Sequence, residues 1–201
     1  MLKLYDYPDC PFCIKVKVAL GEKDLEYETV LVDLAKGEQR TPEFLKLNPY
    51  GKVPVLIDDD VVVYDSTIIN EYLDEEYPVP PLLPEDSAGR ARARQLEDYC
   101  DNSFLPSAGL VLAELAKPEA ERDQERLKRY QSEVQRGLAR LESFLTSGEY
   151  LVGSFSLADI AFVPRVLMLP KLEVELDPRL RHVQAWIQRL RERPSIARLQ
   201  L

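Results

Sequence analysis

The feature that most restricts the fold of this sequence is a run of prolines in its first half. Residues 78–84 read PVPPLLP, with four prolines in seven residues. Because each proline ring fixes φ and removes a backbone N–H, neither a helix nor a central strand continues through such a segment. We therefore expect one domain over residues 1–78, a linker over residues 79–87 and a second domain over residues 88–201.

The first part of the chain alternates strand-like and helix-like segments. Residues 2–5 and 27–32 have the character of strands, and residues 11–20 between them form a helical pattern that Gly21 is expected to close. The elements expected after these are a helix over residues 42–47, a hairpin of residues 53–57 and 61–64, and a helix over residues 66–77. The sequence thus predicts an α/β domain of order βαβαββα.

The second part shows helical periodicity without convincing strand alternation. Its clearest stripe steps by three or four residues and comprises Leu127, Tyr130, Val134, Leu138, Leu141 and Leu145. This spacing places apolar side chains on one helix face, and Gly148 stands just past its end. We expect residues 88–201 to form an all-helical domain.

Charge and composition exclude several classes of protein. The chain has 26 Lys and Arg against 35 Asp and Glu, a net charge of -9, so nucleic acid is not an expected partner. A transmembrane helix needs about 20 consecutive apolar residues, and no apolar stretch of this sequence approaches that length. Asp6 lies where a signal peptide would have its apolar core. We therefore expect a cytoplasmic protein without a membrane partner. Only Cys10 and Cys13 lie close together in the sequence, and the single histidine, His182, is distant from them. Two thiols and one distant imidazole are too few for a four-ligand zinc site, so no metal is expected.

Cys10 and Cys13 form a Cys-x-x-Cys pair between a predicted strand and a predicted helix. If Cys10 is the N-cap and Pro11 the first helical residue, the unpaired N–H groups of the first turn point at the Cys10 sulfur. These donors and the helix dipole favour the thiolate, so they lower the pKa of Cys10 and activate it as a nucleophile. Cys13 is placed to attack a mixed disulfide on Cys10, and we expect its thiol to be more buried with a pKa closer to the ordinary value. The pair indicates redox chemistry in a reducing compartment.

Other interpretations of these residue types remain open. Two nearby cysteines can be small core side chains, because free cysteine is among the most buried residue types. We favour that interpretation for Cys100, which lies in a helical stretch, and we expect Trp186 in the core or lining a groove. Tyr5 and Tyr7 are alternative activating groups near the amino terminus, although Cys10 occupies the better position.

Four motifs occur in an order that resembles the cytosolic glutathione transferase superfamily over nearly the whole chain. They are Cys10-Pro11-Phe12-Cys13, residues 48–56 (NPYGKVPVL), Asp65-Ser66 and Ser156-Leu157-Ala158-Asp159, the last of which also fits a capping box. The cysteine start is similar to the thiol-transferase types, namely the omega-like and lambda-like members and the two-domain glutaredoxins. The resemblance implies a thioredoxin-like amino-terminal domain, a carboxy-terminal helical bundle and a homodimer.

The resemblance also implies glutathione as the co-substrate. Pro54 matches the proline that is cis in this superfamily, and a cis bond there leaves the Val53 main chain facing the thiolate. The cysteinyl part of glutathione is expected to pair with Val53, and Phe12 is expected beside it. An ordinary trans proline that ends a loop is the alternative for Pro54.

The remaining expected contacts bind the two ends of glutathione. Ser66 opens a predicted helix and is expected to bind the γ-glutamyl carboxylate, unless it is only the helix N-cap. Asp65 stands where the superfamily more often has Glu, so its side chain is one methylene shorter. Lys52 is the best match for binding the glycyl carboxylate, and Lys36 and Arg40 are alternatives.

The function expected on these grounds is glutathione-dependent thiol–disulfide oxidoreduction through a mixed disulfide of Cys10, with a small-molecule or protein disulfide as acceptor. Dehydroascorbate reduction is an expected side activity. Conjugation of glutathione to small electrophiles is the alternative enzyme activity, and a non-catalytic transferase-like module that binds proteins is the alternative of another class. Four residues near the domain junction are expected to contact the acceptor: Tyr99, Asn102, Phe104 and Pro106.

Overall fold

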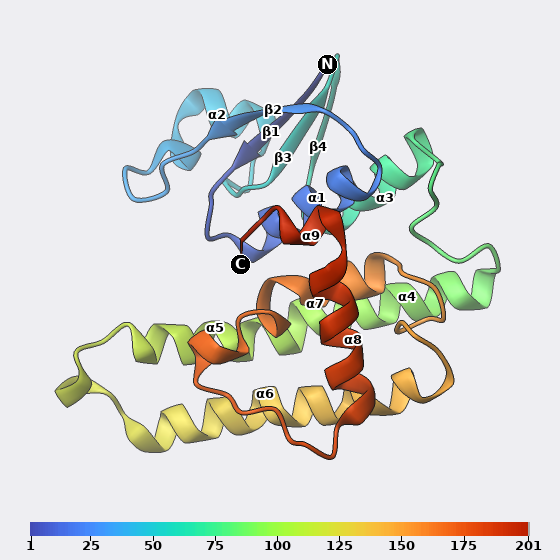
Figure 1. Ribbon diagram of the computed structural model, residues 1–201. Coiled ribbons are helices and arrows are strands. Elements are labelled where there is room, and N and C mark those ends of the chain that lie inside the picture. The colour runs from blue at the N-terminus through green and yellow to red at the C-terminus, as the bar shows by residue number, and fades with distance from the viewer. Residues whose placement is uncertain (201) are drawn as a thin grey trace. The chain divides into compact units, whose positions relative to one another are not determined.

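The structure, a computed structural model, describes residues 1–200 and divides into two compact units, Met1–Pro81 and Leu82–Leu201 (Figure 1). The first unit combines a sheet with helices, and the second is built from helices. Within residues 1–200, no helix has the length and apolar character that spanning a membrane requires.

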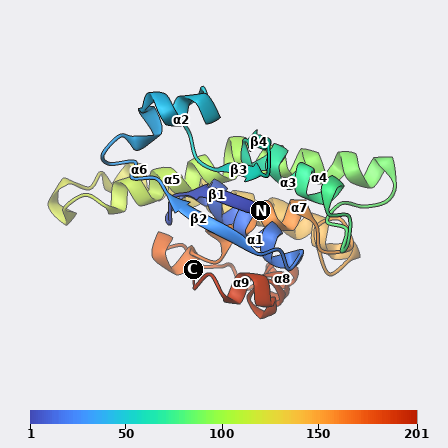
Figure 2. The ribbon, with the colours of Figure 1, turned by 90° about the horizontal axis from the view of Figure 1, so that it is seen from above.

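The amino-terminal unit contains a four-stranded mixed sheet. Its elements are β1 (Leu2–Asp6), α1 (Pro11–Glu22), β2 (Tyr27–Leu31), η1 (Glu38–Arg40), α2 (Pro42–Leu47), β3 (Val55–Asp58), β4 (Val61–Tyr64) and α3 (Ser66–Glu76). The strand order is β2-β1-β3-β4, with β1 parallel to β2 and antiparallel to β3, and β3 antiparallel to β4. Figure 2 shows β1 and β2 side by side, and α1 supplies the crossover that a parallel pair needs. The predicted order βαβαββα and the thioredoxin-like fold are confirmed.

Helix α1 extends beyond Gly21, which the sequence predicted as its end. The N–H of Lys23 still donates to the carbonyl oxygen of Ala19 at 3.1 Å. Asp24 then takes a left-handed conformation with φ +51°, and the N–H of Leu25 donates back to Leu20 at 3.0 Å. The helix is thus terminated by an aspartate in the position that glycine usually occupies, because aspartate tolerates this conformation better than most residues.

The carboxy-terminal unit is helical, as predicted. Its elements are α4 (Ser87–Tyr99), the π-helical η2 (Cys100–Phe104), α5 (Leu105–Leu115), η3 (Glu119–Glu121), α6 (Gln124–Phe144), η4 (Leu145–Ser147), α7 (Leu157–Val166), η5 (Leu169–Leu172), α8 (Arg181–Glu192) and α9 (Pro194–Ala197). The predicted apolar stripe lies on α6 and η4, where Leu127, Val134, Leu138, Leu141 and Leu145 are buried. Tyr130 of that stripe is only partly buried.

The predicted capping box at residues 156–159 is present at the start of α7. The fully buried carboxylate of Asp159 accepts hydrogen bonds from the N–H of Ser156 at 3.0 Å and from that of Leu151 at 3.1 Å. Burial raises the pKa of Asp159 to about 6, although these donors act in the opposite direction. The motif is therefore a structural anchor of the helical unit.

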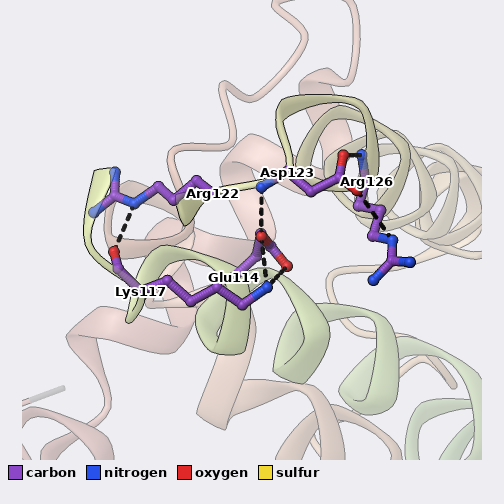
Figure 3. Close-up of polar contacts among 5 residues, drawn as sticks. All are labelled: Glu114, Lys117, Arg122, Asp123 and Arg126. Atoms are coloured by element: carbon purple, nitrogen blue, oxygen red, sulfur yellow. Dashed lines mark hydrogen bonds and ion pairs between the residues drawn. The ribbon is translucent and has the colours of Figure 1, made fainter. Parts of the chain in front are cut away.

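The connection between α5 and α6 is closed by Glu114 (Figure 3). Its carboxylate accepts from Nζ of Lys117 at 2.7 Å and from the N–H of Asp123 at 2.6 Å. Arg122 donates to the carbonyl oxygen of Lys117 at 3.1 Å. Asp123 in turn caps α6 by accepting from the N–H of Arg126 at 3.0 Å. One buried carboxylate therefore joins the end of α5 to the cap of α6.

Candidate active site

Cys10 is the N-cap residue of α1, and Pro11 is its first helical residue, as the sequence predicted. A tight turn holds the cap, because the N–H of Cys10 donates to the carbonyl oxygen of Tyr7 at 3.0 Å. The carbonyl oxygen of Cys10 accepts from the N–H of Ile14 at 3.0 Å, which begins the helix. The side chain of Cys10 is therefore held at the positive end of the α1 dipole.

The Cys10 sulfur has donors that stabilise its thiolate. The thiol of Cys13 donates to it, and the backbone N–H groups of Cys13 and Phe12 are directed toward it, although neither makes a capping hydrogen bond of regular geometry. These donors lower the pKa of Cys10 to about 7, while burial and the negative charge of Asp6 oppose them. The sulfur is thus ionised to a large extent near neutral pH.

Cys13 departs from the expectation of a nearly ordinary pKa. Its thiol donates to Cys10 and is fully buried, and both effects raise its pKa well above the ordinary value. The side chain packs in an apolar cluster with Val32, Phe44 and Val55. Cys13 therefore packs as a core side chain, which was the alternative interpretation of these cysteines. At the same time, the hydrogen bond from its thiol stabilises the negative charge of the Cys10 thiolate.

The loop before β3 carries the peptide bond between Val53 and Pro54, which is cis as expected. The carbonyl oxygen of Val53 lies 4.0 Å from the Cys10 sulfur. Asn48, which the sequence reasoning did not select, fastens this loop: its Nδ2 donates to the carbonyl oxygen of Lys52 at 2.7 Å, and its Oδ1 accepts from the N–H of Tyr50 at 2.9 Å. An asparagine in a turn is the sequence signal that could have identified it.

A groove of about 540 Å³ lies next to this loop, entirely within the unit Met1–Pro81. It is lined by Phe12, Asn48, Tyr50, Lys52, Val53, Pro54, Tyr64, Asp65, Ser66 and Ile68. All six residues predicted to bind glutathione are thus brought together. Besides Asn48, the groove contains Tyr50, Tyr64 and Ile68, which were not predicted, because a lone aromatic or aliphatic side chain carries no binding signal in a single sequence.

Asp65 and Ser66 have divided roles at the start of α3. Asp65 is the N-cap, with φ +74°, and its side chain accepts from the N–H groups of Thr67 at 3.0 Å and Ile68 at 3.4 Å. Ser66 is the first helical residue and is buried. The capping role left open for Ser66 therefore belongs to Asp65.

Of the three cationic candidates, Lys52 lines the groove. Lys36 is paired with Asp33 at 3.0 Å, and neither Lys36 nor Arg40 lines the groove.

Tyr5, which the sequence analysis considered as an alternative activating group, packs edge-on against the ring of Phe44.

Three residues considered in the helical unit lie in its core. Cys100 is fully buried, with its sulfur 3.2 Å from the carbonyl oxygen of Ala161. Trp186 is fully buried as well. Phe104, which the sequence reasoning assigned to an acceptor wall, is buried with its ring 5.3 Å from that of Phe162, so it is a packing residue.

Comparisons with known proteins extend over both units. The family model of the glutathione S-transferase N-terminal domain matches residues 4–81, and that of the C-terminal domain matches residues 104–194. A zeta-class glutathione S-transferase of Euphorbia esula is 38% identical over 168 residues, covering 82% of this chain and 74% of the relative. A probable maleylacetoacetate isomerase of Vibrio cholerae is 36% identical over 204 residues, covering 98% of this chain and 94% of the relative.

Solved structures give the same result. The glutathione transferase URE2P8 of Phanerochaete chrysosporium, crystallised with oxidized glutathione, has a TM-score of 0.85 and 30% identity, and the match covers 99% of this chain and 93% of that one. Both domain models and relatives of similar length therefore agree with the motifs and the fold. The chain is an enzyme of the glutathione S-transferase family.

Proposed function

We propose that this protein is a glutathione-dependent thiol–disulfide oxidoreductase of the cysteine type, with Cys10 as its nucleophile. The main support is the Cys10 sulfur, which has a pKa of about 7 and lies 4.0 Å from the carbonyl oxygen of the groove residue Val53. A thiol with a pKa of about 7 is about half ionised at neutral pH, whereas one with a pKa of about 9 is only about 1% ionised. The Cys13 thiol, together with the backbone N–H groups of the helix start, thus increases the thiolate fraction of Cys10 about fiftyfold.

Glutathione would occupy the groove as an extended peptide. Its cysteinyl main chain would pair with the N–H and C=O of Val53, which places its sulfur next to Cys10. Ser66 and the amino-terminal end of α3 would bind the γ-glutamyl carboxylate, and the Asp65 carboxylate would attract the neighbouring ammonium group. Lys52 would bind the glycyl carboxylate. A relative of similar fold was crystallised with oxidized glutathione, which supports this occupant.

The reaction begins when the Cys10 thiolate attacks the glutathione sulfur of a mixed disulfide. A bond forms between the Cys10 and glutathione sulfurs, and the acceptor sulfur leaves as a thiolate that takes up a proton. A second glutathione thiolate can then attack Cys10-bound glutathione, which releases glutathione disulfide and restores the Cys10 thiolate. Alternatively, Cys13 attacks Cys10, releases glutathione and leaves a Cys10–Cys13 disulfide for glutathione to reduce.

The proposal is tested by steady-state assays with β-hydroxyethyl disulfide and glutathione. We expect Cys10→Ser to lose at least about a hundredfold in kcat/KM, because a serine hydroxyl is not ionised near neutral pH. Cys13→Ser should accumulate the glutathione adduct on Cys10, which intact-protein mass spectrometry detects. A Cys10→Ser variant with undiminished disulfide reduction would overturn the proposal.

A second candidate is the glutathione-dependent isomerisation of an unsaturated diacid, or conjugation of glutathione to a related electrophile. It is favoured by the identity of 36% over nearly the whole chain with a probable maleylacetoacetate isomerase. This chemistry needs a glutathione thiolate that persists in the groove, whereas Cys10 tends to form a disulfide with it. If Cys10→Ser retains or increases turnover of maleylacetoacetate or chlorodinitrobenzene while the parent protein lacks disulfide reduction, the second candidate is correct.

A further inference from the structure

A second groove, on the helical unit, takes no part in the chemistry described above. It consists of two cavities, of about 440 Å³ and about 310 Å³, both within the unit Leu82–Leu201. Pro170 of η5 and Arg191 of α8 line both cavities, so the two adjoin and form one groove, which we call the α8 groove. One wall is formed by residues 169–176 and the other by α8 and α9, the red helices of Figure 1.

The floor of the α8 groove is apolar and its outer wall is fixed. The floor is formed by five buried side chains, those of Val166, Leu169, Val174, Ile187 and Ile196. The wall opposite α8 is held by Gln131 of α6, whose Nε2 donates to the carbonyl oxygens of Leu172 and Glu173, each at 3.1 Å. A fixed apolar hollow of this kind receives an aliphatic or aromatic side chain without a large cost in ordering.

Two cations stand at the rim of the α8 groove. Lys171 and Arg191 are exposed, and neither side chain has an ion pair or a hydrogen bond with any residue from 1 to 200. Glu192, the acidic neighbour of Arg191, accepts from Nε2 of Gln188 at 2.8 Å. Among the residues that the structure describes, no acidic side chain lines either cavity. The rim therefore offers two positive charges to an anionic group.

The charge of this region is opposite to that of the chain. Residues 179–200 contain six arginines and one acidic residue, whereas the whole chain has a net charge of -9. Two of these arginines are engaged: Arg189 donates to a backbone carbonyl oxygen at 3.1 Å, and Arg193 donates to the hydroxyl of Tyr150 at 3.1 Å. Arg191 lies between them and keeps its donors for a partner, in a positive region that attracts acidic surfaces.

The combination of floor and rim is suited to an extended peptide. Its alternate side chains lie on one face, about 6.7 Å apart, so an apolar side chain and a carboxylate two residues away can reach the floor and the rim together. Gln184, Gln188 and Gln200 are exposed along the groove, and their amide groups can both donate to and accept from a peptide main chain. Nucleic acid is disfavoured, because its phosphates require many cations and the floor here is apolar.

We propose that the α8 groove docks an extended acidic segment of a partner protein. An apolar side chain of the segment lies in the cavity lined by Val174 and Ile187, and a carboxylate two residues away pairs with Arg191 and Lys171 at the rim. This interaction goes beyond the proposed function and does not depend on the chemistry of Cys10.

The first test uses the full chain and fluorescence polarisation of a labelled seven-residue peptide in which Glu and Leu alternate. We expect saturable binding that is at least about tenfold tighter than that of the peptide alternating Lys and Leu, because the rim is cationic. The peptide alternating Glu and Ser should also bind at least about tenfold more weakly, because it cannot fill the floor. Absence of saturable binding, or equal binding of the three peptides, would refute the proposal.

Substitutions at the rim locate the binding. Arg191→Gln and Lys171→Gln should each weaken binding of the Glu-Leu peptide about fivefold to tenfold. Arg181→Gln removes the same charge from an exposed arginine of α8 that lines neither cavity, and this control should stay within about twofold of the parent. All three side chains are exposed, so the variants should keep the parent Tm. Equal losses in Arg191→Gln and Arg181→Gln would mean general attraction by the basic helix and would exclude docking in the groove.

Further measurements separate the peptide from other occupants. Bound peptide should slow hydrogen exchange in residues 169–176, and slowing confined to other segments would contradict the assignment. If Arg191→Gln changes the sedimentation coefficient of the protein alone, a second copy of the chain occupies the groove instead. If the parent binds vesicles of phosphatidylglycerol and phosphatidylcholine through Arg191 but does not bind the peptide, the occupant is a membrane surface. Either result would overturn the proposal.

Discussion

The indole N–H of Trp186 on α8 donates a hydrogen bond of 2.8 Å to the carboxylate of Asp159 at the start of α7. The same carboxylate receives the N–H of Leu151 and both donors of Ser156. Four donors from three separate segments of the helical unit therefore converge on one fully buried side chain. Because a buried donor without an acceptor is costly, the unit depends on this residue.

We expect Asp159→Ala to lower the free energy of unfolding by about 3–5 kcal/mol, since it leaves all four donors unsatisfied. Trp186→Phe removes one donor and leaves the carboxylate with three others, so its loss should be smaller, about 1–3 kcal/mol. Urea denaturation of both variants measures the difference. Equal losses would show that packing of the indole ring outweighs the shared carboxylate.

The ionisation of Cys10 should depend on its contact with Cys13. Iodoacetamide alkylation followed by peptide mass spectrometry should give a midpoint at pH about 7 for Cys10. In Cys13→Ala the donor with the largest effect is lost, so the midpoint should rise toward that of an ordinary thiol. A midpoint that does not move would assign the low pKa to the helix start alone.

Lys23 should be essential to the amino-terminal unit. Its Nζ is buried and donates to Asp74 at 2.9 Å and to the carbonyl oxygens of Tyr77 at 2.7 Å and Pro80 at 2.9 Å. Lys23→Met removes the ion-pair partner of the buried Asp74 carboxylate and the donor to both carbonyl oxygens, for which we expect a loss of about 3–5 kcal/mol in chemical denaturation. Lys3→Met, at an exposed ion pair, should cost less than about 1 kcal/mol.

Adding Asp74→Leu to Lys23→Met should recover part of that loss, because the buried charge that has lost its ion-pair partner is removed. A double variant less stable than the single one would mean that the two carbonyl contacts, rather than the ion pair, dominate.

The α5–α6 connection should loosen in acid. The ion pair with Lys117 and the N–H of Asp123 lower the pKa of Glu114, so its contribution is present above the unfolded value and is lost as the pH falls. We expect the hydrogen-exchange protection of the Asp123 amide to decrease below pH about 4.5. Glu114→Gln should have low protection throughout, whereas Glu121→Gln, in the exposed turn, should match the parent. Protection in the parent that is independent of pH would contradict this account.

Lys52 is expected to be the cation that binds glutathione. Lys52→Met should raise the KM for glutathione about tenfold with little change in kcat. The reason is that the ion pair between Lys52 and the glycyl carboxylate is equally strong in the ground state and in the transition state. Lys36→Met removes an equal charge outside the groove and is the control. Similar KM values in the two variants would indicate a general electrostatic effect.

Much of the fold and the site follows from local rules that act along a few residues. The prolines of residues 78–84 interrupt regular structure, and the alternating segments before them predict the α/β unit. Pro11 directly after Cys10 predicts that the Cys10 sulfur lies at the start of a helix. In the structure, Cys10 is the N-cap of α1 and Pro11 is its first residue. The groove residues Val53 and Ser66 could be selected because they belong to short motifs whose resemblance to a family is visible in one sequence.

Other features depend on contacts between residues far apart in the chain, and only the tertiary structure decides them. The strong upward shift of the Cys13 pKa requires the sulfur of Cys10 within reach and an apolar cluster around it. Asp6 looks like an ordinary polar residue at a strand end until the sheet and α1 bury it and leave one oxygen without a donor. Phe104 is a core residue because Phe162 packs against it. The burial of a side chain and the charges near it depend on residues that are distant in the sequence, so residue spacing along the chain does not predict them.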